Sequence, residues 1–119
     1  MNHKPKYSIF KNSMYAIDGL VHAFKTETSF KLELFFSFFI FIGIYFVPVS
    51  ISLKLILLIT LFLIMIVELL NSAVENVVDL VTTDIHPLAK TAKDMGATAV
   101  LFSVILHILC WIFVFFSLF

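Results

Sequence analysis

The chain has 119 residues, of which 61% are hydrophobic and only 13% are charged. A soluble domain of this size carries about 25% charged and about 45–50% apolar residues, so the composition excludes an ordinary soluble domain and a disordered chain. Eight lysines balance eight acidic residues and there is no arginine, which excludes the basic patch of a nucleic-acid-binding module.

Residues 1–31 are mixed in polarity and form a predicted interfacial segment. Apolar residues such as Ile9, Tyr15 and Phe24 are interspersed with charged residues over positions 6–31, which contain few helix breakers. This pattern predicts an amphipathic helix that lies on the membrane surface and does not cross it. Because the segment lacks an apolar run followed by a cleavage site, we do not expect it to be a cleavable secretion signal.

Three long apolar runs follow the N-terminal segment. A chain of this size has too small an interior to bury so many apolar residues away from water, so we expect them to contact lipid. About 20 helical residues cross a hydrocarbon core of about 30 Å, and a helix satisfies its own backbone hydrogen bonds there. We expect transmembrane helices at about 32–49, 52–81 and 95–118, separated by a tight turn near Pro48 and by a loop at 82–94. The predicted fold is a single all-α integral membrane domain that takes up all 119 residues.

Lysines are unevenly distributed around the predicted spans. Five lie in the N-terminal segment and two, Lys90 and Lys93, lie in the loop at 82–94. The turn between the first two spans has only Lys54, and the C-terminal end has none. Because positively charged flanks stay in the cytoplasm, we expect a cytoplasmic N-terminus and loop, and an external C-terminus.

A stripe of polar residues marks the second span, formed by Glu68, Asn71, Glu75 and Asp79. At about 100° per residue, these positions fall within roughly 80° of one another on one helix face. An acidic side chain inside a span costs about 2.5–3.5 kcal/mol on insertion scales. The stripe is either a set of contacts between helices or a polar cleft that opens to the cytoplasm. We do not expect one three-span chain to shield Glu68, Asn71 and Glu75 from lipid, which predicts an oligomer.

More charged residues flank the cytoplasmic end of this stripe. The loop carries Asp84, His86, Lys90, Lys93 and Asp94. They form either a solvated turn with a helix start, or a site beside the acidic helix. Glu27 and Glu33 lie where the surface helix runs into the first span, and Glu27 matters only if the fold brings it next to Glu75. Two carboxylates together with phosphate oxygens and waters suit Mg²⁺.

Two runs of sequence resemble the signature of one enzyme family. Residues 68–79 read ELLNSAVENVVD, and residues 92–96, which follow His86, read AKDMG. Together they are similar to the prokaryotic diacylglycerol kinase family, and the resemblance covers nearly the whole chain. It implies a homotrimeric helical bundle with three spans per subunit in the bacterial inner membrane, with active sites assembled from neighbouring subunits.

The resemblance also implies a reaction. The family uses ATP and Mg²⁺ to phosphorylate the primary hydroxyl of diacylglycerol, which gives phosphatidic acid in lipid recycling. Asp79–Leu80 and the run from His86 to Lys90 also resemble a sister branch that phosphorylates undecaprenol, so undecaprenol is the alternative substrate. Two other classes of function stay open. One is a proton-relay or transport subunit, since intramembrane acids also mark proton paths, and the other is a purely structural membrane subunit.

Individual residues take roles from the resemblance. Glu68 matches the general base and Asn71 the polar residue beside it, while Glu27 and Glu75 match the carboxylates that hold Mg²⁺ against the nucleotide phosphates. The matched ATP contacts are Tyr15, Glu27, Glu75, Asp84, Ile85, His86, Lys93 and Asp94. The matched lipid-substrate contacts are Phe30, Glu33, Glu68 and Asn71.

Three positions depart from the family pattern. Ser8 stands where several relatives have arginine, and Asp18 and Leu80 stand where better-known relatives carry basic residues. Lys6 or Lys11 is the expected substitute for the basic contact missing at Ser8, as a point charge and not as a bidentate fork. These departures concern the outer contacts of the nucleotide and not the reaction.

Overall fold

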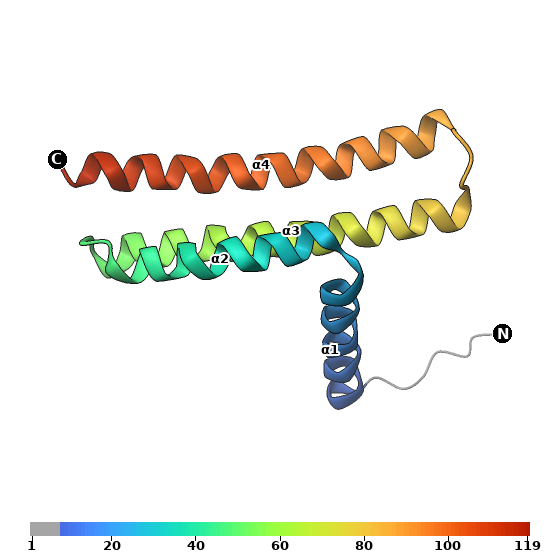
Figure 1. The fold of residues 1–119 in the computed structure, drawn as a ribbon, viewed down its shortest axis with the longest axis horizontal. Helices are drawn as coiled ribbons and strands as arrows, with labels where there is room; N and C mark the ends of the chain where they lie inside the picture. Colours follow the sequence, from blue (N-terminus) through green and yellow to red (C-terminus); the bar gives the residue numbers. More distant parts are fainter. Residues whose placement is uncertain (1–7) are drawn as a thin grey trace.

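The computed structural model describes residues 8–119 as four α-helices joined by short connections. They are α1 (Ile9–Thr26), α2 (Thr28–Phe46), α3 (Ile51–Val81) and α4 (Pro87–Ser117). α2, α3 and α4 run alongside one another with α3 packed against the other two, whereas α1 leaves this bundle at a steep angle (Figure 1). Lys6, one of the two expected substitutes for the contact missing at Ser8, lies outside the described residues.

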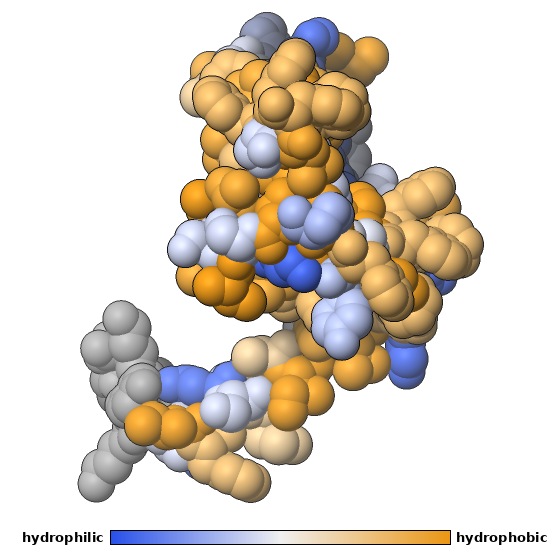
Figure 2. Space-filling model, turned by 90° about the vertical axis from the view of Figure 1, so that its left-hand side faces the viewer, coloured by the Kyte–Doolittle hydropathy of each residue, from blue (hydrophilic) through white to orange (hydrophobic). Residues whose placement is uncertain are grey.

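Three of these helices, α2, α3 and α4, are long and apolar enough to cross a membrane, which confirms the three predicted spans. Most of the bundle surface visible in Figure 2 is hydrophobic. Large apolar side chains such as Phe38 on α2 and Phe113 on α4 point outward and are exposed. Such a surface is typical of a bundle whose outer faces contact lipid.

α3 and α4 are longer than a membrane is thick. Each has 31 residues, or about 46 Å of helix, whereas the hydrocarbon core is about 30 Å thick. Roughly ten residues of each helix therefore extend beyond the core. The C-terminal end of α3 and the N-terminal end of α4 carry the charged residues and meet at the turn 82–86, so these are the ends that protrude.

The chain bends sharply between α1 and α2 at Glu27 (Figure 1). The φ of −100° and ψ of 105° at this residue are extended, so the helix is interrupted there. Residues 28–31, which the sequence placed in the surface segment, belong instead to the first spanning helix. α1 begins at Ile9 because the side chain of Ser8 accepts a hydrogen bond from the backbone of Lys11. The location of α1 on the membrane surface stays a prediction.

α4 begins at Pro87, so the connection from α3 is shorter than the predicted loop at 82–94. Proline suits the first turn of a helix, where its missing N–H would have no partner within the helix. His86 caps this helix, since its ring Nδ1 accepts a hydrogen bond of 3.1 Å from the backbone of Leu88. The alanines, lysines and leucine that follow have high helix propensity, and the charged residues among them hide this helix from an analysis of hydropathy alone. The connection is therefore confined to 82–86.

An apolar core and a buried polar network hold the bundle together. The core consists of Ile44, Leu57, Leu61 and Val114, contributed by α2, α3 and α4. On the same stretch of α3, Thr60 Oγ1 lies 2.7 Å from His107 Nδ1, and Trp111 Nε1 donates a hydrogen bond of 3.0 Å to His107 Nε2. His107 is buried, and its ring links α4 to α3.

Candidate active site

The polar stripe of α3 runs from the bundle interior to the surface. Glu68 is only 6% exposed, Asn71 and Glu75 are half-buried, and Asp79 is exposed. This gradient follows the path of α3, which is covered by its neighbours at Glu68 and protrudes near its C-terminal end. The same chain buries Glu68 but leaves Asn71 and Glu75 partly exposed, so the prediction that one chain does not shield all three residues fails for Glu68 alone.

Carboxyl groups from three parts of the chain gather around Glu68. The side chain of Glu33 on α2 lies against that of Glu68, and Glu75 and Glu27 are near enough for their charges to act on it. One carboxyl oxygen of Glu33 is buried without a hydrogen-bond partner in residues 8–119. We call Glu27, Glu33, Glu68 and Glu75 the acidic cluster. The bend at Glu27 brings this residue towards α3, which its position in the sequence does not reveal.

Asn71 joins the acidic cluster to α4. Its Nδ2 donates a hydrogen bond of 3.3 Å to Oε1 of Glu75, one turn further along α3. Its Oδ1 is buried and faces Gly96 of α4. Asn71 is thus a contact between helices, as one interpretation of the stripe predicts, whereas its part in a functional cleft stays a prediction.

A pocket of about 340 Å³ lies at the α3–α4 turn. Five residues matched to ATP contacts line it, namely Asp84, Ile85, His86, Lys93 and Asp94. Asp79 and Lys90, to which the resemblance gave no role, also line it. We call this space the turn pocket. Its volume lies within the range of about 300–1,000 Å³ that is usual for small-molecule sites.

Lys93 connects the turn pocket to the acidic cluster. Its Nζ lies 2.7 Å from Oδ1 of Asp79 in an ion pair between α4 and α3. The hydrogen bond that it donates to Asp79 raises the pKa of Lys93, and the nearby charge of Glu75 adds to this effect. An exposed ion pair of this kind contributes little to stability, so the charged Lys93 can exchange Asp79 for a phosphate group at little cost.

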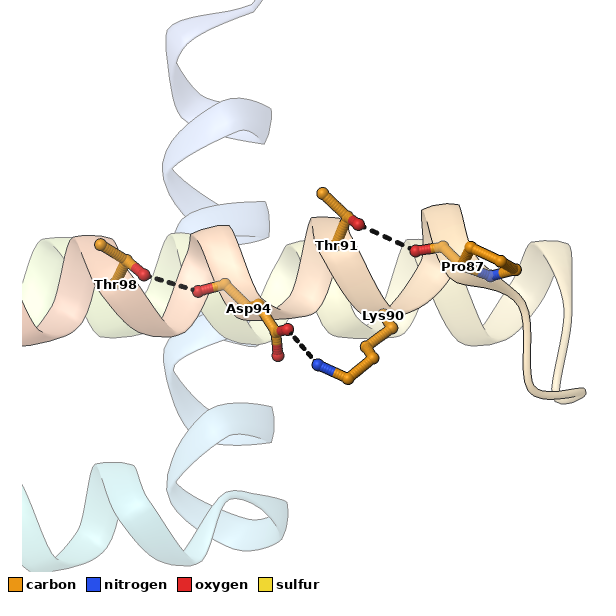
Figure 3. Close-up of polar contacts among 5 residues, drawn as sticks. All are labelled: Pro87, Lys90, Thr91, Asp94 and Thr98. Atoms are coloured by element: carbon orange, nitrogen blue, oxygen red, sulfur yellow. Dashed lines mark hydrogen bonds and ion pairs between the residues drawn. The ribbon is translucent and has the colours of Figure 1, made fainter.

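The first turns of α4 carry a second ion pair, between Lys90 and Asp94 (Figure 3). On the same turns, the hydroxyls of Thr91 and Thr98 each donate a hydrogen bond of 2.9 Å to the carbonyl four residues earlier. The i, i+4 spacing of Lys90 and Asp94 is the sequence signal that predicts such a pair once the helix start is known. The signal for Asp79 is its position at the cytoplasmic end of the polar stripe.

Two other matched residues, Tyr15 and Phe30, do not line the turn pocket. Tyr15 is 60% exposed on α1 and does not line the turn pocket. Phe30 is only 1% exposed in the first turn of α2, whereas Glu33, one turn later, is half-buried. The contact of Tyr15 with nucleotide and that of Phe30 with lipid stay predictions.

The acidic cluster offers the oxygen ligands that Mg²⁺ prefers. Within residues 8–119, no group of three or more His, Cys, Asp or Glu side chains is arranged to hold a metal ion. Mg²⁺, however, commonly binds one or two carboxylates and takes its other ligands from phosphates and water. Within residues 8–119, Glu27 and Glu75 are linked only through the charge that each exerts on Glu68, so a Mg²⁺ site shared by these two carboxylates stays a prediction.

Comparison with known proteins gives a consistent set of relatives. The family described as prokaryotic diacylglycerol kinase matches residues 14–115. A diacylglycerol kinase of Haemophilus influenzae is 37% identical over 103 residues, which is 87% of each chain. One of Helicobacter pylori is 35% identical over 103 residues, 87% of this chain and 80% of its own. One of Escherichia coli K12 is 51% identical over 49 residues, 41% of this chain and 40% of its own.

Proposed function

This chain belongs to the prokaryotic diacylglycerol kinase family, and we propose that it transfers the γ-phosphoryl group of ATP to the primary hydroxyl of diacylglycerol, which gives phosphatidic acid. The chain is a lipid kinase, and its three long apolar helices fit a membrane protein. One observation carries the finer proposal. The charge of Glu75 in the acidic cluster acts on Lys93, which lines the turn pocket, so carboxylates suited to a proton acceptor and a metal lie near a lysine and a pocket suited to a nucleotide.

The depth of Glu68 suits a lipid substrate. Glu68 lies 17 residues, or about 26 Å, along α3 from Ile51. With Ile51 at the outer surface, this places Glu68 near the inner boundary of a hydrocarbon core of about 30 Å. The hydroxyl of a two-chain lipid lies at the same boundary while its acyl chains stay in the core. A buried carboxylate at that depth can therefore meet the hydroxyl.

The reaction requires a proton acceptor and positive charge. Glu68 accepts the proton of the lipid hydroxyl as the hydroxyl oxygen bonds to the γ-phosphorus of ATP, while the bond from that phosphorus to the β–γ bridging oxygen breaks and ADP leaves. Lys93 contacts the phosphates and offsets their charge. Glu27 and Glu75 would hold Mg²⁺, which when bound supplies further positive charge at the phosphates.

The proposal includes an assembly and a location. We place the protein as a homotrimer in the bacterial inner membrane, with the N-terminus and the α3–α4 turn in the cytoplasm and the C-terminus outside. The lysine distribution supports this orientation. The exposed apolar side chains on the protruding end of α3 support an oligomer, because water disfavours them.

A competition between two lipids tests the reaction. Purified protein in mixed micelles is offered diacylglycerol and undecaprenol together, with Mg²⁺ and ATP labelled in its γ-phosphate, and the lipids are separated by thin-layer chromatography. We expect label in phosphatidic acid, and none when the metal is chelated. If only undecaprenyl phosphate is labelled, undecaprenol and not diacylglycerol is the substrate. The runs Asp79–Leu80 and His86–Lys90, which resemble the sister branch, favour that alternative. An absence of labelled lipid would instead leave the transport or structural role.

A further inference from the structure

We infer that Gly96 and Asn71 act as a positioning pair that holds the carboxylate of Glu75 in place across the contact between α3 and α4. The inference rests on the proposed function, in which Glu75 binds Mg²⁺. It adds a residue, Gly96, that touches neither substrate nor metal and acts through Asn71.

Gly96 admits the Asn71 side chain because it has no Cβ. A Cβ at Gly96 would lie 2.1 Å from Oδ1 and 3.2 Å from Cγ of Asn71, which is too close for either atom to stay in place. The other two glycines of the chain, Gly19 and Gly43, have open space at the same position. Since glycine weakens a helix interior relative to alanine, the tenth residue of α4 is a costly place for it without such a contact.

Two partners fix the orientation of the Asn71 amide. Its Nδ2 donates to the carboxylate of Glu75, and its buried Oδ1 has no conventional donor among residues 8–119. Glycine carries a second Cα hydrogen in the direction that Cβ would take, so Gly96 presents a weak C–H donor to Oδ1. A flipped amide would put Oδ1 against the Glu75 carboxylate, with two acceptors facing each other. The arrangement therefore holds Glu75 through Asn71.

Alanine at position 96 displaces the amide without breaking the fold. The atoms that it meets belong to the end of a flexible side chain and not to the backbone. We expect Asn71 to rotate away and Glu75 to lose its hydrogen-bond donor, while α3 and α4 stay packed. The loss should appear in metal binding, because residues that orient a ligand typically change metal affinity by about 10–100-fold.

The test compares Gly96→Ala with Gly43→Ala, a matched glycine-to-alanine change in a spanning helix with open space. Mn²⁺ is titrated against each purified protein in the presence of a non-hydrolysable ATP analogue and followed by electron paramagnetic resonance. We expect about tenfold weaker Mn²⁺ binding for Gly96→Ala and no change for Gly43→Ala. In turnover assays, Gly96→Ala should need more Mg²⁺ for half-maximal rate than Gly43→Ala does. A lower kcat or melting temperature with unchanged metal dependence would make Gly96 a packing residue only and overturn the inference.

A double variant tests the pairing itself. Asn71→Ala removes the donor to Glu75, so adding Gly96→Ala to it should cause no further loss of Mn²⁺ affinity. Additive losses would refute the pair.

A nuclear magnetic resonance experiment keeps this test separate from the proposed function. The chain has four asparagines, Asn2, Asn12, Asn71 and Asn76, so side-chain amide spectra of protein labelled at asparagine are simple to assign with Asn71→Ala. We expect Gly96→Ala, but not Gly43→Ala, to shift the Asn71 amide signal. An unshifted signal would overturn the inference even if the kinase activity is confirmed. A shifted signal in a protein without kinase activity would overturn the proposed function alone.

Discussion

Glu68 and Glu75 lie seven residues apart on one face of α3, yet their surroundings differ. Glu68 is buried against the carboxyl group of Glu33, where water is largely excluded. Glu75 is half-buried, accepts a hydrogen bond from Asn71 and lies near the charge of Lys93. Along the helix axis, about 10.5 Å separates the two residues. Two carboxylates so far apart and so differently solvated should fail in different ways when replaced.

Replacing Glu68 by glutamine should remove the proton acceptor and little else. We expect Glu68→Gln to lower kcat by about 10²–10⁴-fold, which is the usual contribution of a general base. Nucleotide affinity should stay nearly unchanged, because the base acts on the lipid hydroxyl and not on ATP. Measurement of kcat and of the KM for ATP at several Mg²⁺ concentrations checks this, since no concentration of metal replaces a missing base.

Replacing Glu75 or Glu27 by glutamine should instead weaken the binding of Mg·ATP. A lost carboxylate lowers metal affinity, which mass action offsets, so we expect excess Mg²⁺ or Mn²⁺ to restore part of the rate. The rate of each variant as a function of metal concentration is the measurement. Rescue of Glu68→Gln by metal, together with no rescue of Glu75→Gln, would show that the two roles have been assigned the wrong way round.

The helices show which parts of the structure could be predicted from sequence. The three spans follow directly from hydropathy, because each apolar run is long enough to cross a membrane. The start of α4 at Pro87 differs from the predicted loop at 82–94, because the first turns of α4 are charged and hydropathy does not distinguish a polar helix from a loop. The break between α1 and α2 falls at Glu27, where no glycine or proline is present to predict it from the sequence.

The candidate site was predictable to a similar degree. The stripe on α3 follows from spacing alone, because its residues share one helix face. The approach of Glu33 to Glu68 depends on how α2 packs against α3, and the contact of Gly96 with Asn71 depends on how α4 does. Neither arrangement is encoded in the spacing of residues within a single helix.

The hydrogen bond between Thr60 of α3 and His107 of α4 predicts that replacing Thr60 will destabilise the fold. Thr60 donates its hydroxyl hydrogen to the carbonyl of Ile56 or Leu57, so its oxygen accepts the Nδ1 hydrogen of His107. Thr60→Val keeps the shape of the side chain but leaves that N–H buried and unpaired. We expect the free energy of unfolding to fall by about 1–3 kcal/mol, measured by titration from mild detergent into dodecyl sulfate.

The control for this change is Thr98→Val on α4. Thr98 is exposed, and its hydroxyl donates a hydrogen bond to the carbonyl of Asp94 in its own helix (Figure 3). We expect little change in the free energy of unfolding for this variant. Equal effects of Thr60→Val and Thr98→Val would mean that the network does not hold α3 to α4.

The orientation of the whole chain in the membrane follows from its lysines. The C-terminus lies at the same end of the bundle as the α2–α3 turn, and the α3–α4 turn lies at the opposite end (Figure 1). We expect a reporter fused after Phe119 to be external and one inserted at Thr83 to be cytoplasmic, because lysines are retained on the cytoplasmic side. The activities of alkaline phosphatase and a fluorescent protein at these sites give the measurement. The opposite result would place the turn pocket outside the cytoplasm, where it could not bind cytoplasmic ATP, and would contradict its assignment as a nucleotide site.

The apolar surface on the protruding end of α3 predicts the oligomeric state. Val77, Leu80 and Val81 are exposed there, beyond the length of helix that lipid covers, so contact with water is unfavourable. Burial of Glu68 within one chain removes one reason to expect an oligomer, and this surface supplies another. We expect a homotrimer by native mass spectrometry in mild detergent. Val77→Lys should release monomers and lower activity, whereas Thr91→Lys, which adds the same charge at an exposed position outside the turn pocket, should not. A fully active monomer would contradict this assembly.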